Sequence, residues 1–151
     1  MIEVQIIRTD VMLNEALALR VEVFVDEQKV PKTEEVDYLD NVSSIENKKV
    51  IHIVALFQQR IVGTARLIFD VPENEYPHIG RVAVKKEFRG RNIGRTIMDK
   101  LHQIAKKKLY DGVTLSAQIE VRDFYTKLGY VPRGSIYMDV GIPHQDMDYV
   151  F

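Results

Sequence analysis

Hydrophobic and polar residues recur along the chain with two periods, one typical of strands and one typical of helices. Runs rich in β-branched and aromatic residues, bounded by turn residues, predict strands. These runs lie at residues 4–9, 50–57, 61–69, 78–84, 113–117, 130–131 and 136–140. Gln58, Gln59 and Arg60 join the second run to the third, so we expect this pair to form a hairpin.

Helical spacing appears in three segments. Asp10 stands as the N-cap of a helix that extends to about Val25, and a short helix ends at Gly129. Residues 26–49 predict only a short helix with loops. The clearest amphipathic helix has an apolar stripe made of Ile93, Ile97, Met98, Leu101, Ile104 and Ala105. Strands and helices interleave, which favours an α/β or α+β fold, a sheet with helices on its faces, over a bundle or a sandwich.

The composition narrows the class of protein. With 151 residues, 46% of them hydrophobic, the chain is expected to form one domain, 1–151, around one core. Cysteine is absent, which excludes disulfides, thiolate zinc sites and cysteine nucleophiles, and fits a reducing compartment. No apolar stretch approaches the ~20 residues that span a bilayer, and the first residues lack a signal-peptide core. We therefore expect a cytoplasmic protein with no membrane partner.

Charge is balanced overall but uneven along the chain. The formal net charge is −1, which argues against nucleic acid as a partner. The segment from Arg81 to Lys108 is strongly basic, however, and the segment from Asp26 to Glu46 is acidic. These segments could bind an anionic and a cationic ligand at different places, or be two solvated faces.

The junction between the strand at 78–84 and the following helix has the strongest chemical signal. Its glycines, Gly90 and Gly94, let the backbone approach a ligand closely, and the free amides of a helix start bind phosphate. Arg89, Arg91 and Arg95 add charged donors suited to a pyrophosphate. The pattern is neither a GxxxxGK[ST] loop nor a GxGxxG fingerprint, which disfavours nucleoside triphosphates and dinucleotides.

The segment Arg89–Gly94 resembles the acetyl-coenzyme A motif of the GNAT superfamily, Arg/Gln-x-x-Gly-x-Gly/Ala. Downstream, Phe124–Tyr130 (FYTKLGY) is similar to the second motif of that superfamily, an aromatic pair followed by a Leu-Gly-aromatic turn. Arg20–Gln28 (RVEVFVDEQ), the acidic loop around Glu35 and the tail Gly141–His144 resemble its small bacterial ElaA-like branch. The resemblance covers nearly the whole chain.

The resemblance implies a GNAT fold, in which a mixed, mostly antiparallel sheet is splayed between its fourth and fifth strands and has helices on both faces. The pantetheine arm of acetyl-coenzyme A would lie in the gap, bound by the backbone of Val82, Ala83 and Val84. The pyrophosphate would be held by the loop of Arg89, Gly90, Arg91, Asn92, Ile93, Gly94 and Arg95. Asn92 departs from the motif, because it stands where the family has its central glycine. Asparagine tolerates left-handed backbone geometry best among the other residues, although its side chain could crowd or hydrogen-bond the pyrophosphate.

The implied activity is transfer of an acetyl group from acetyl-coenzyme A to a primary amine. Tyr125 is the residue carried over as the proton donor to the departing thiolate, and its alternative role is packing on the sheet. The chain offers no cysteine, no serine in a nucleophile turn and no histidine–acid pair at metal-ligand spacing. We therefore expect direct transfer without a metal.

The acidic loop is expected to bias the acceptor site toward cationic amines, through Glu34, Glu35, Asp37 and Asp40. His144, near the C-terminus, is a further candidate for the acceptor pocket.

The general base is open among Glu120, His52 and a water relay. His52 stands inside an apolar strand, which is more typical of a hydrogen-bonded core histidine. His78 and His102 have the pattern of loop and helix-surface residues.

Other hypotheses stay open at this stage. The donor could be another acyl-coenzyme A, or the chain could be a non-catalytic acyl-coenzyme A binding or sensing module. A nucleic-acid binder is disfavoured, because no aromatic residues interleave with the basic segment. The identity of the amine and a homodimeric assembly are not decided by the sequence.

Overall fold

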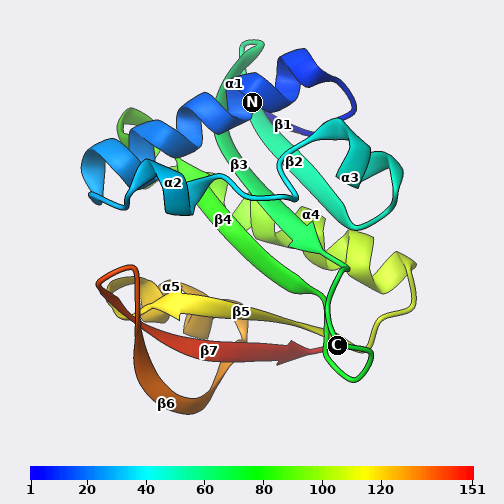
Figure 1. Ribbon diagram of the computed structural model, residues 1–151, viewed down its shortest axis with the longest axis vertical. Helices are drawn as coiled ribbons and strands as arrows, with labels where there is room; N and C mark the ends of the chain where they lie inside the picture. The colour runs from blue at the N-terminus through cyan, green and yellow to red at the C-terminus, as the bar shows by residue number, and fades with distance from the viewer.

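The computed structural model describes residues 1–151, and its seven strands form one sheet in the order β1-β2-β3-β4-β5-β7-β6 (Figure 1). The strands are β1 (Ile2–Ile6), β2 (Val50–Phe57), β3 (Arg60–Ile68), β4 (His78–Val84), β5 (Gly112–Gln118), β6 (Val131–Asp139) and β7 (Ile142–Val150). The helices are α1 (Asp10–Arg20), α2 (Lys32–Glu35), α3 (Val42–Glu46), α4 (Ile93–Lys107) and α5 (Arg122–Leu128). A π-helical segment, η1 (Val21–Glu27), continues α1, and two 3₁₀ turns, η2 (Lys86–Phe88) and η3 (Ile119–Val121), precede α4 and α5. None of the helices is long and apolar enough to cross a membrane.

The sheet is splayed between its fourth and fifth strands, as predicted. Every neighbouring pair of strands is antiparallel except β4 and β5, which are parallel. These two strands pair at His78↔Thr114 and Ile79↔Leu115 and then separate. In Figure 1, β5, β7 and β6 consequently lie apart from the rest of the sheet on one side. The mixed, mostly antiparallel fold class is thereby confirmed.

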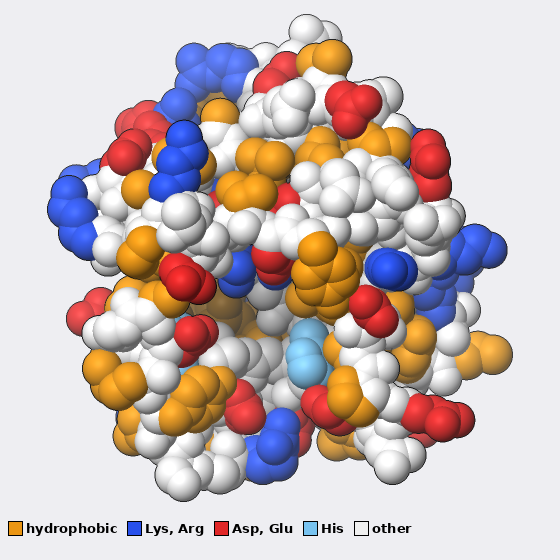
Figure 2. All heavy atoms as spheres, viewed as in Figure 1, with side chains coloured by type: hydrophobic (Ala, Val, Ile, Leu, Met, Phe, Trp, Pro, Cys, Tyr) orange, Lys and Arg blue, Asp and Glu red, His pale blue; other side chains and the backbone are white.

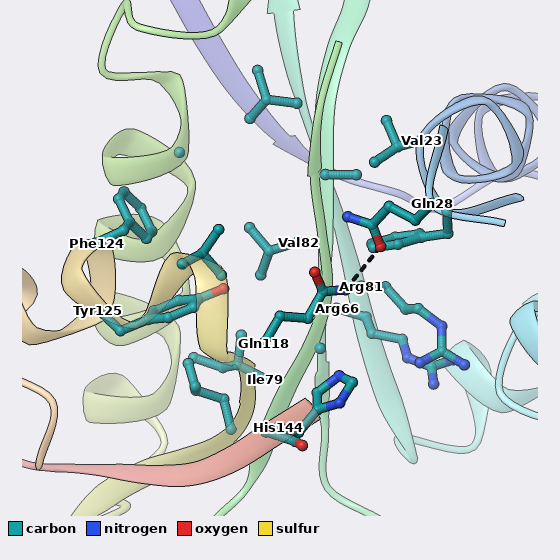
Figure 3. Close-up of a pocket in the computed structure, with 18 of the residues that line it drawn as sticks. Val23, Gln28, Arg66, Ile79, Arg81, Val82, Gln118, Phe124, Tyr125 and His144 are labelled. Carbon is teal, nitrogen blue, oxygen red and sulfur yellow. Dashed lines mark hydrogen bonds between the residues drawn. The ribbon is translucent and has the colours of Figure 1, made fainter. Parts of the chain in front are cut away.

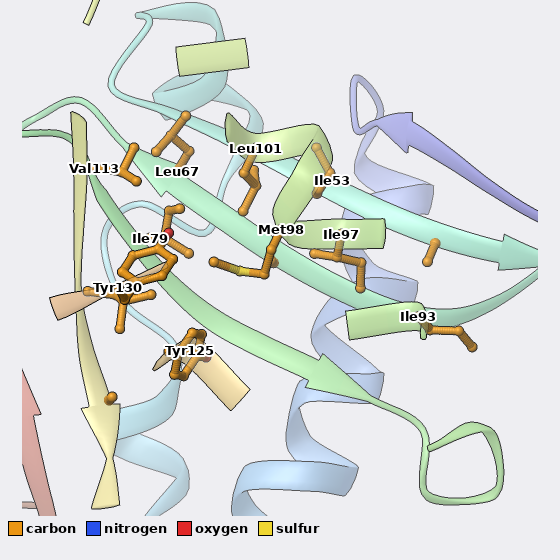
Figure 4. Packing of buried hydrophobic residues seen from close by; sticks show 14 of the residues in the cluster. Ile53, Leu67, Ile79, Ile93, Ile97, Met98, Leu101, Val113, Tyr125 and Tyr130 are labelled. Atoms are coloured by element: carbon orange, nitrogen blue, oxygen red, sulfur yellow. The ribbon is translucent and has the colours of Figure 1, made fainter. Parts of the chain in front are cut away.

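Helices cover both faces of the sheet, because side chains of a strand alternate between its faces. In β2, Ile53 and Ala55 join the core under α4, whereas Val54 and Leu56 join a second cluster under α1. The stripe of α4 contributes Ile97, Met98 and Leu101, all fully buried (Figure 4). Burying each such side chain stabilises the fold by about 1.5–3 kcal/mol. The amphipathic pattern of this helix thus anchors it behind β3 and β4 and fixes where it begins.

A bulge bends β4 next to the splay. Gly80 pairs with Arg66 and Ala83 pairs with Thr64, so that Arg81 and Val82 stand opposite one residue of β3. Arg81 adopts a left-handed conformation with φ of 54°, which is rare for a residue with a side chain. Bulges bend a strand and redirect its side chains. The bend therefore carries the second half of β4 away from β5.

The predicted elements are confirmed in the centre of the chain and differ at its ends. The hairpin of β2 and β3, the strand at 78–84 and the three helices are present, although the first is α-helical only to Arg20 and continues as the π-helical η1. At the first helix, Thr9 rather than Asp10 is the N-cap, since its hydroxyl accepts from the Met12 amide at 3.3 Å. The segment 26–49 holds two short helices, α2 and α3, in place of the one expected.

The C-terminal strands were predicted wrongly. One strand, β6, replaces the two short strands expected at 130–131 and 136–140, and the segment read as a tail is strand β7. β7 lies between β5 and β6 and pairs with both. Its sequence, IPHQDMDYV, includes proline and aspartates of low strand propensity, so tertiary pairing outweighs local preference here. His144 therefore belongs to an ordered strand.

Candidate active site

A cavity of about 1200 Å³ opens where β4 and β5 separate. In Figure 2 the front of the molecule is hollowed at its centre, with acidic and basic side chains around the rim. Pockets for one small ligand measure roughly 300–1,000 Å³. The volume therefore suits a long ligand together with a second, smaller one.

The start of α4 forms one end of the cavity. Asn92 has φ of 63° and ψ of 16°, so it adopts the left-handed geometry that the sequence predicted it would tolerate. No side chain caps the helix. The first backbone hydrogen bond of the helix runs from the Thr96 amide to the Asn92 carbonyl, at 3.1 Å. The amides of Ile93, Gly94 and Arg95 are therefore unpaired, at the positive end of the helix dipole. These residues line the cavity, as does Gly90 with φ of 79°.

The three arginines of this loop have different surroundings. Arg89 donates to both carboxylate oxygens of Glu27 at 3.0 Å and to the Val84 carbonyl at 3.0 Å. Arg91 does not line the cavity, and its guanidinium lies over the Phe88 ring, 5.0 Å from the ring centroid. Arg95 lines the cavity and has no ion-pair or hydrogen-bond partner. Arg95 is thus the arginine most available to an anion.

The second half of β4 forms the wall of the cavity. Beyond Ile79, its edge toward β5 has no strand to pair with. Val82, Ala83 and Val84 all line the cavity, although the Ala83 side chain is buried against Leu19 and Val23 on the opposite face. An unpaired strand edge leaves backbone donors and acceptors available for an extended ligand.

Tyr125 lies opposite this wall, on α5. Its ring packs edge-on against Phe124 and Tyr130, with centroid distances of 5.1 and 5.7 Å. The hydroxyl has no hydrogen-bond partner in the protein, and Figure 3 shows it directed toward Val82 across the cavity. Burial raises the pKa of Tyr125 to about 12. The site therefore holds a protonated phenol whose ring is fixed and whose hydroxyl is free.

Three arginine side chains hold the acids of the predicted acceptor loop, and of these Arg20 and Arg66 are buried while Arg81 is 29% exposed. Arg20 donates to Glu35 at 2.8 Å and to Asp40 at 2.7 Å. Arg66 donates to both oxygens of Asp37, at 2.8 and 2.7 Å, and to Asp40 at 3.0 Å. Arg81 lies 3.3 Å from Glu35. We call this group, Arg20, Arg66, Arg81, Glu35, Asp37 and Asp40, the ion network.

The predicted acceptor residues differ in whether they line the cavity and in whether their carboxylate oxygens are paired. Asp37 and Asp40 do not line the cavity, and their oxygens accept hydrogen bonds from Arg20 and Arg66, so the bias toward cationic amines predicted for them stays a prediction. Burial by itself would raise the pKa of Asp37, but hydrogen bonding and charge from Arg66 lower it to about 2. Glu34 and Glu35 do line the cavity, and Glu35 Oε2 is buried with no hydrogen-bond partner. Glu35 is therefore the acid of the ion network that lines the cavity and has a carboxylate oxygen without a hydrogen-bond partner.

The histidines fall into three environments. His144 and His78 line the cavity, from β7 and from the start of β4. His52 is buried, its Nε2 donates to the Leu39 carbonyl at 2.9 Å, and its pKa is lowered by burial, as expected of a core histidine. His102 is buried too, bonded to the Tyr130 hydroxyl at 2.6 Å, which corrects the expectation of a helix-surface residue.

The ion network was missed at the level of sequence, although a signal was present. Arg66 and Arg81 interrupt apolar strand runs, and Arg20 falls among the apolar positions of the first helix. A charged residue at a core-facing position is stable only when it is paired. Those three arginines therefore indicate that acids lie nearby, and the acidic loop supplies these acids.

Comparison with known proteins gives consistent similarities over the full length. Residues 20–151 match the family model described as an acetyltransferase (GNAT) domain. YjcF from Bacillus subtilis, named as an N-acetyltransferase, is 35% identical over 143 residues, covering 94% of this chain and 95% of YjcF. The crystal structure of ElaA from Escherichia coli has a TM-score of 0.85 at 30% identity and covers 98% of this chain and 99% of ElaA. An aminoglycoside 6′-N-acetyltransferase complexed with coenzyme A has a TM-score of 0.75 at 15% identity, covering 99% and 96%, and is a likeness of fold.

Proposed function

Because the chain belongs to the GNAT acetyltransferase family, we propose that it transfers an acetyl group from acetyl-coenzyme A directly to a primary amine of a small molecule or peptide. The observation that carries this proposal is one cavity bordered by three features, the uncapped start of α4, the open edge of β4 and the Tyr125 hydroxyl. These are an anion site, a backbone edge for an extended chain and a proton donor. Acetyl-coenzyme A has a pyrophosphate, an amide-containing arm and a thioester to match them.

The fit of coenzyme A is supported by the local backbone. A methyl group built on Gly90 would meet nothing within 4 Å, so the loop is open on that side. The free amides of Ile93, Gly94 and Arg95 would bind the pyrophosphate, with Arg95 adding charge. The arm would bond the edge of β4 at Val82 and Val84. This arrangement directs the thioester toward Tyr125.

The direct test combines binding with turnover. We expect calorimetry to detect binding of coenzyme A, and a thiol-release assay with acetyl-coenzyme A to show turnover with members of an amine panel. Binding without thiol release from any amine would favour the sensing module instead. Faster thiol release from a longer acyl-coenzyme A than from acetyl-coenzyme A would mean that the transferred group is that longer acyl group.

The loop arginines give a prediction with an internal control. We expect Arg95→Glu to weaken coenzyme A binding by roughly 30- to 150-fold, since a charged hydrogen bond of about 2–3 kcal/mol is lost and a repulsion is added. Arg91→Glu makes the same charge change on a side chain that stacks on Phe88 and does not itself line the cavity. Its effect should stay below about fivefold, because exposed charges are screened by salt. Calorimetry compares the two variants, and equal losses would assign the effect to the general field of the basic segment.

The acceptor is proposed to be a cationic amine that contacts Glu35. Its Oε1 is held by Arg20 and lies near Arg81, whereas Oε2 is buried without a partner in the cavity lining. A buried polar atom without a partner is unfavourable, and an ammonium group from the acceptor would satisfy it. Glu34 adds a second acid to the same end of the cavity.

This assignment predicts a selective kinetic effect. Glu35→Gln keeps an oxygen for Arg20 and removes the charge, so we expect the acceptor KM to rise roughly 10- to 100-fold. The KM for acetyl-coenzyme A should not change. Asp37→Asn is the matched control, since Asp37 belongs to the same loop but does not line the cavity. Equal changes in both Michaelis constants, or a selective effect of Asp37→Asn, would contradict the contact with Glu35.

A further inference from the structure

Acetyl transfer of the kind proposed above needs a group that accepts a proton from the acceptor. A primary amine is mostly protonated at neutral pH, and only its neutral form has the lone pair that attacks a thioester. The side chain that takes this proton must reach the acceptor end of the cavity with a free acceptor atom. The structure contains one histidine that meets these conditions.

His144 is held in one tautomer by the backbone. Its Nδ1 lies 2.7 Å from the Ile142 carbonyl oxygen. A carbonyl oxygen can only accept, so Nδ1 carries the hydrogen and the neutral ring has its lone pair on Nε2. Nε2 has no hydrogen-bond partner in the protein, and the residue is 7% exposed while lining the cavity. Nε2 is therefore a free hydrogen-bond acceptor on a residue that lines the cavity and is little exposed to bulk solvent.

The ring is also fixed from the side. Tyr137 on β6 stacks on it, with centroids 6.1 Å apart and planes 19° from parallel. The Tyr137 hydroxyl in turn donates to Asp146 at 2.6 Å and contacts Ser116 on β5. Three strands therefore hold the imidazole in place. In Figure 3, His144 reaches into the cavity from β7 and Tyr125 reaches into it from α5.

Charged and titratable groups on the neighbouring elements line the same space. They are Tyr137, Arg133 and Asp139 on β6, Asp146 on β7, Glu120 on η3, Tyr125 on α5 and Arg81 on β4. The arginines among them, Arg81 and Arg133, are engaged with acids. β5 contributes Ser116 and Gln118, which do not titrate in this range.

The other candidate bases are placed less well. His52 does not line the cavity and is bonded to the Leu39 carbonyl. Glu120 lines the cavity but is exposed, with no hydrogen bond that orients its carboxylate. His78 is paired with Glu75 at 3.0 Å, and its side chain is 37% exposed at the rim.

We infer that His144 is the general base of the reaction, and this inference rests on the proposed function. Nε2 takes one proton from the acceptor ammonium, leaving the lone pair that forms the bond to the carbonyl carbon. The carbon–sulfur bond then breaks, its electron pair goes to sulfur, and Tyr125 protonates the thiolate. The nitrogen loses its second proton as the amide forms, which restores Tyr125, and the imidazolium releases the first proton to solvent. One proton is released per acetyl group transferred.

The kinetic test compares His144→Gln with His78→Gln on an accepted amine. For His144→Gln we expect kcat/KM to fall by ~10²–10³ at neutral pH, and the deficit to shrink as pH approaches the pKa of the amine. A structural defect would give the same loss at every pH. The KM for acetyl-coenzyme A should not change, and His78→Gln should match the parent. A His144→Gln profile parallel to that of the parent would overturn the inference.

A second measurement does not depend on turnover or on a variant. Nitrogen-15 NMR of the imidazoles in the unaltered protein should show the neutral ring of His144 with the hydrogen on Nδ1 and with Nε2 free. Protonation on Nε2 instead, or an imidazolium throughout pH 6–9, would overturn the inference. If the parent released no thiol with any amine, the proposed function would fail, and the NMR result would still decide the state of His144.

Discussion

Removing the Tyr125 hydroxyl, by Tyr125→Phe, is expected to lower turnover by ~10²–10⁴ with little change in either Michaelis constant. The physical reason is that the ring and the hydroxyl of Tyr125 have different surroundings. Its ring is wedged between Phe124 and Tyr130 in the core, and phenylalanine retains that packing. Its hydroxyl has no partner in the protein, and burial raises the pKa of Tyr125 to about 12, so the phenol stays protonated at neutral pH. The hydroxyl can thus donate to a thiolate and adds nothing to the packing.

The measurement is steady-state thiol release from parent and variant with one accepted amine. Thermal melting and coenzyme A calorimetry serve as controls, and both should be nearly unchanged. Tyr130→Phe is the matched variant, because that hydroxyl is bonded to His102 and Tyr130 does not line the cavity. It should lose stability and keep turnover. An active Tyr125→Phe enzyme would show that Tyr125 only packs and that another group protonates sulfur.

The parts of the fold that the sequence predicted are those in which local pattern and tertiary packing agree. The stripe of α4 is buried on the one face that its period indicates, and the continuous β-branched runs of β2 and β3 are buried on both faces. The loop proposed to bind the pyrophosphate could also be predicted, because glycine, left-handed asparagine and a helix start are local features. The splay of the sheet followed from resemblance, since no local pattern reveals where two strands part.

What the sequence did not reveal depends on contacts between distant segments. β7 is a strand because it lies between β5 and β6, and its own residues favour a strand weakly. The role proposed for Glu35 depends on which arginine pairs with which acid. These partners are far apart in the sequence, as Arg66 and Asp37 are. The surroundings of the His144 ring depend on the pairing of β6 with β7, which brings Tyr137 beside it. A residue list can contain such side chains without indicating which atoms remain free.

The ion network is expected to make a large contribution to folding through Arg20. Its side chain is 2% exposed and donates to the Glu35 carboxylate, to Asp40 and to the Glu35 carbonyl. Arg20→Met keeps the apolar stem but leaves buried carboxylates without their main partner. Losing one member of a buried pair costs about 3–5 kcal/mol, a large share of the roughly 5–15 kcal/mol that stabilises a domain. Urea unfolding at neutral pH measures the difference.

A surface pair provides the control for this prediction. Arg133 donates to Asp148 at 2.8 Å, the same distance as between Arg20 and Glu35, but its side chain is 57% exposed. Arg133→Met should therefore cost less than about 1 kcal/mol. Similar losses in the two variants would mean that burial does not distinguish the pairs, and that the network is not a main source of stability.

Acid provides an independent test of the same network. Arg66 outweighs the effect of burial and lowers the pKa of Asp37 to about 2, and Arg20 and Arg66 together lower that of Asp40. A depressed carboxylate pKa stabilises the fold fully above the unfolded value of about 3.9, and this stabilisation is lost as pH falls through the folded value. We therefore expect the free energy of unfolding of the parent to fall between about pH 4 and pH 2. Arg20→Met has already lost the partner that Asp40 needs, so its free energy of unfolding should fall less over that interval. Equal acid sensitivity in parent and variant would assign the acid transition to carboxylates outside the network.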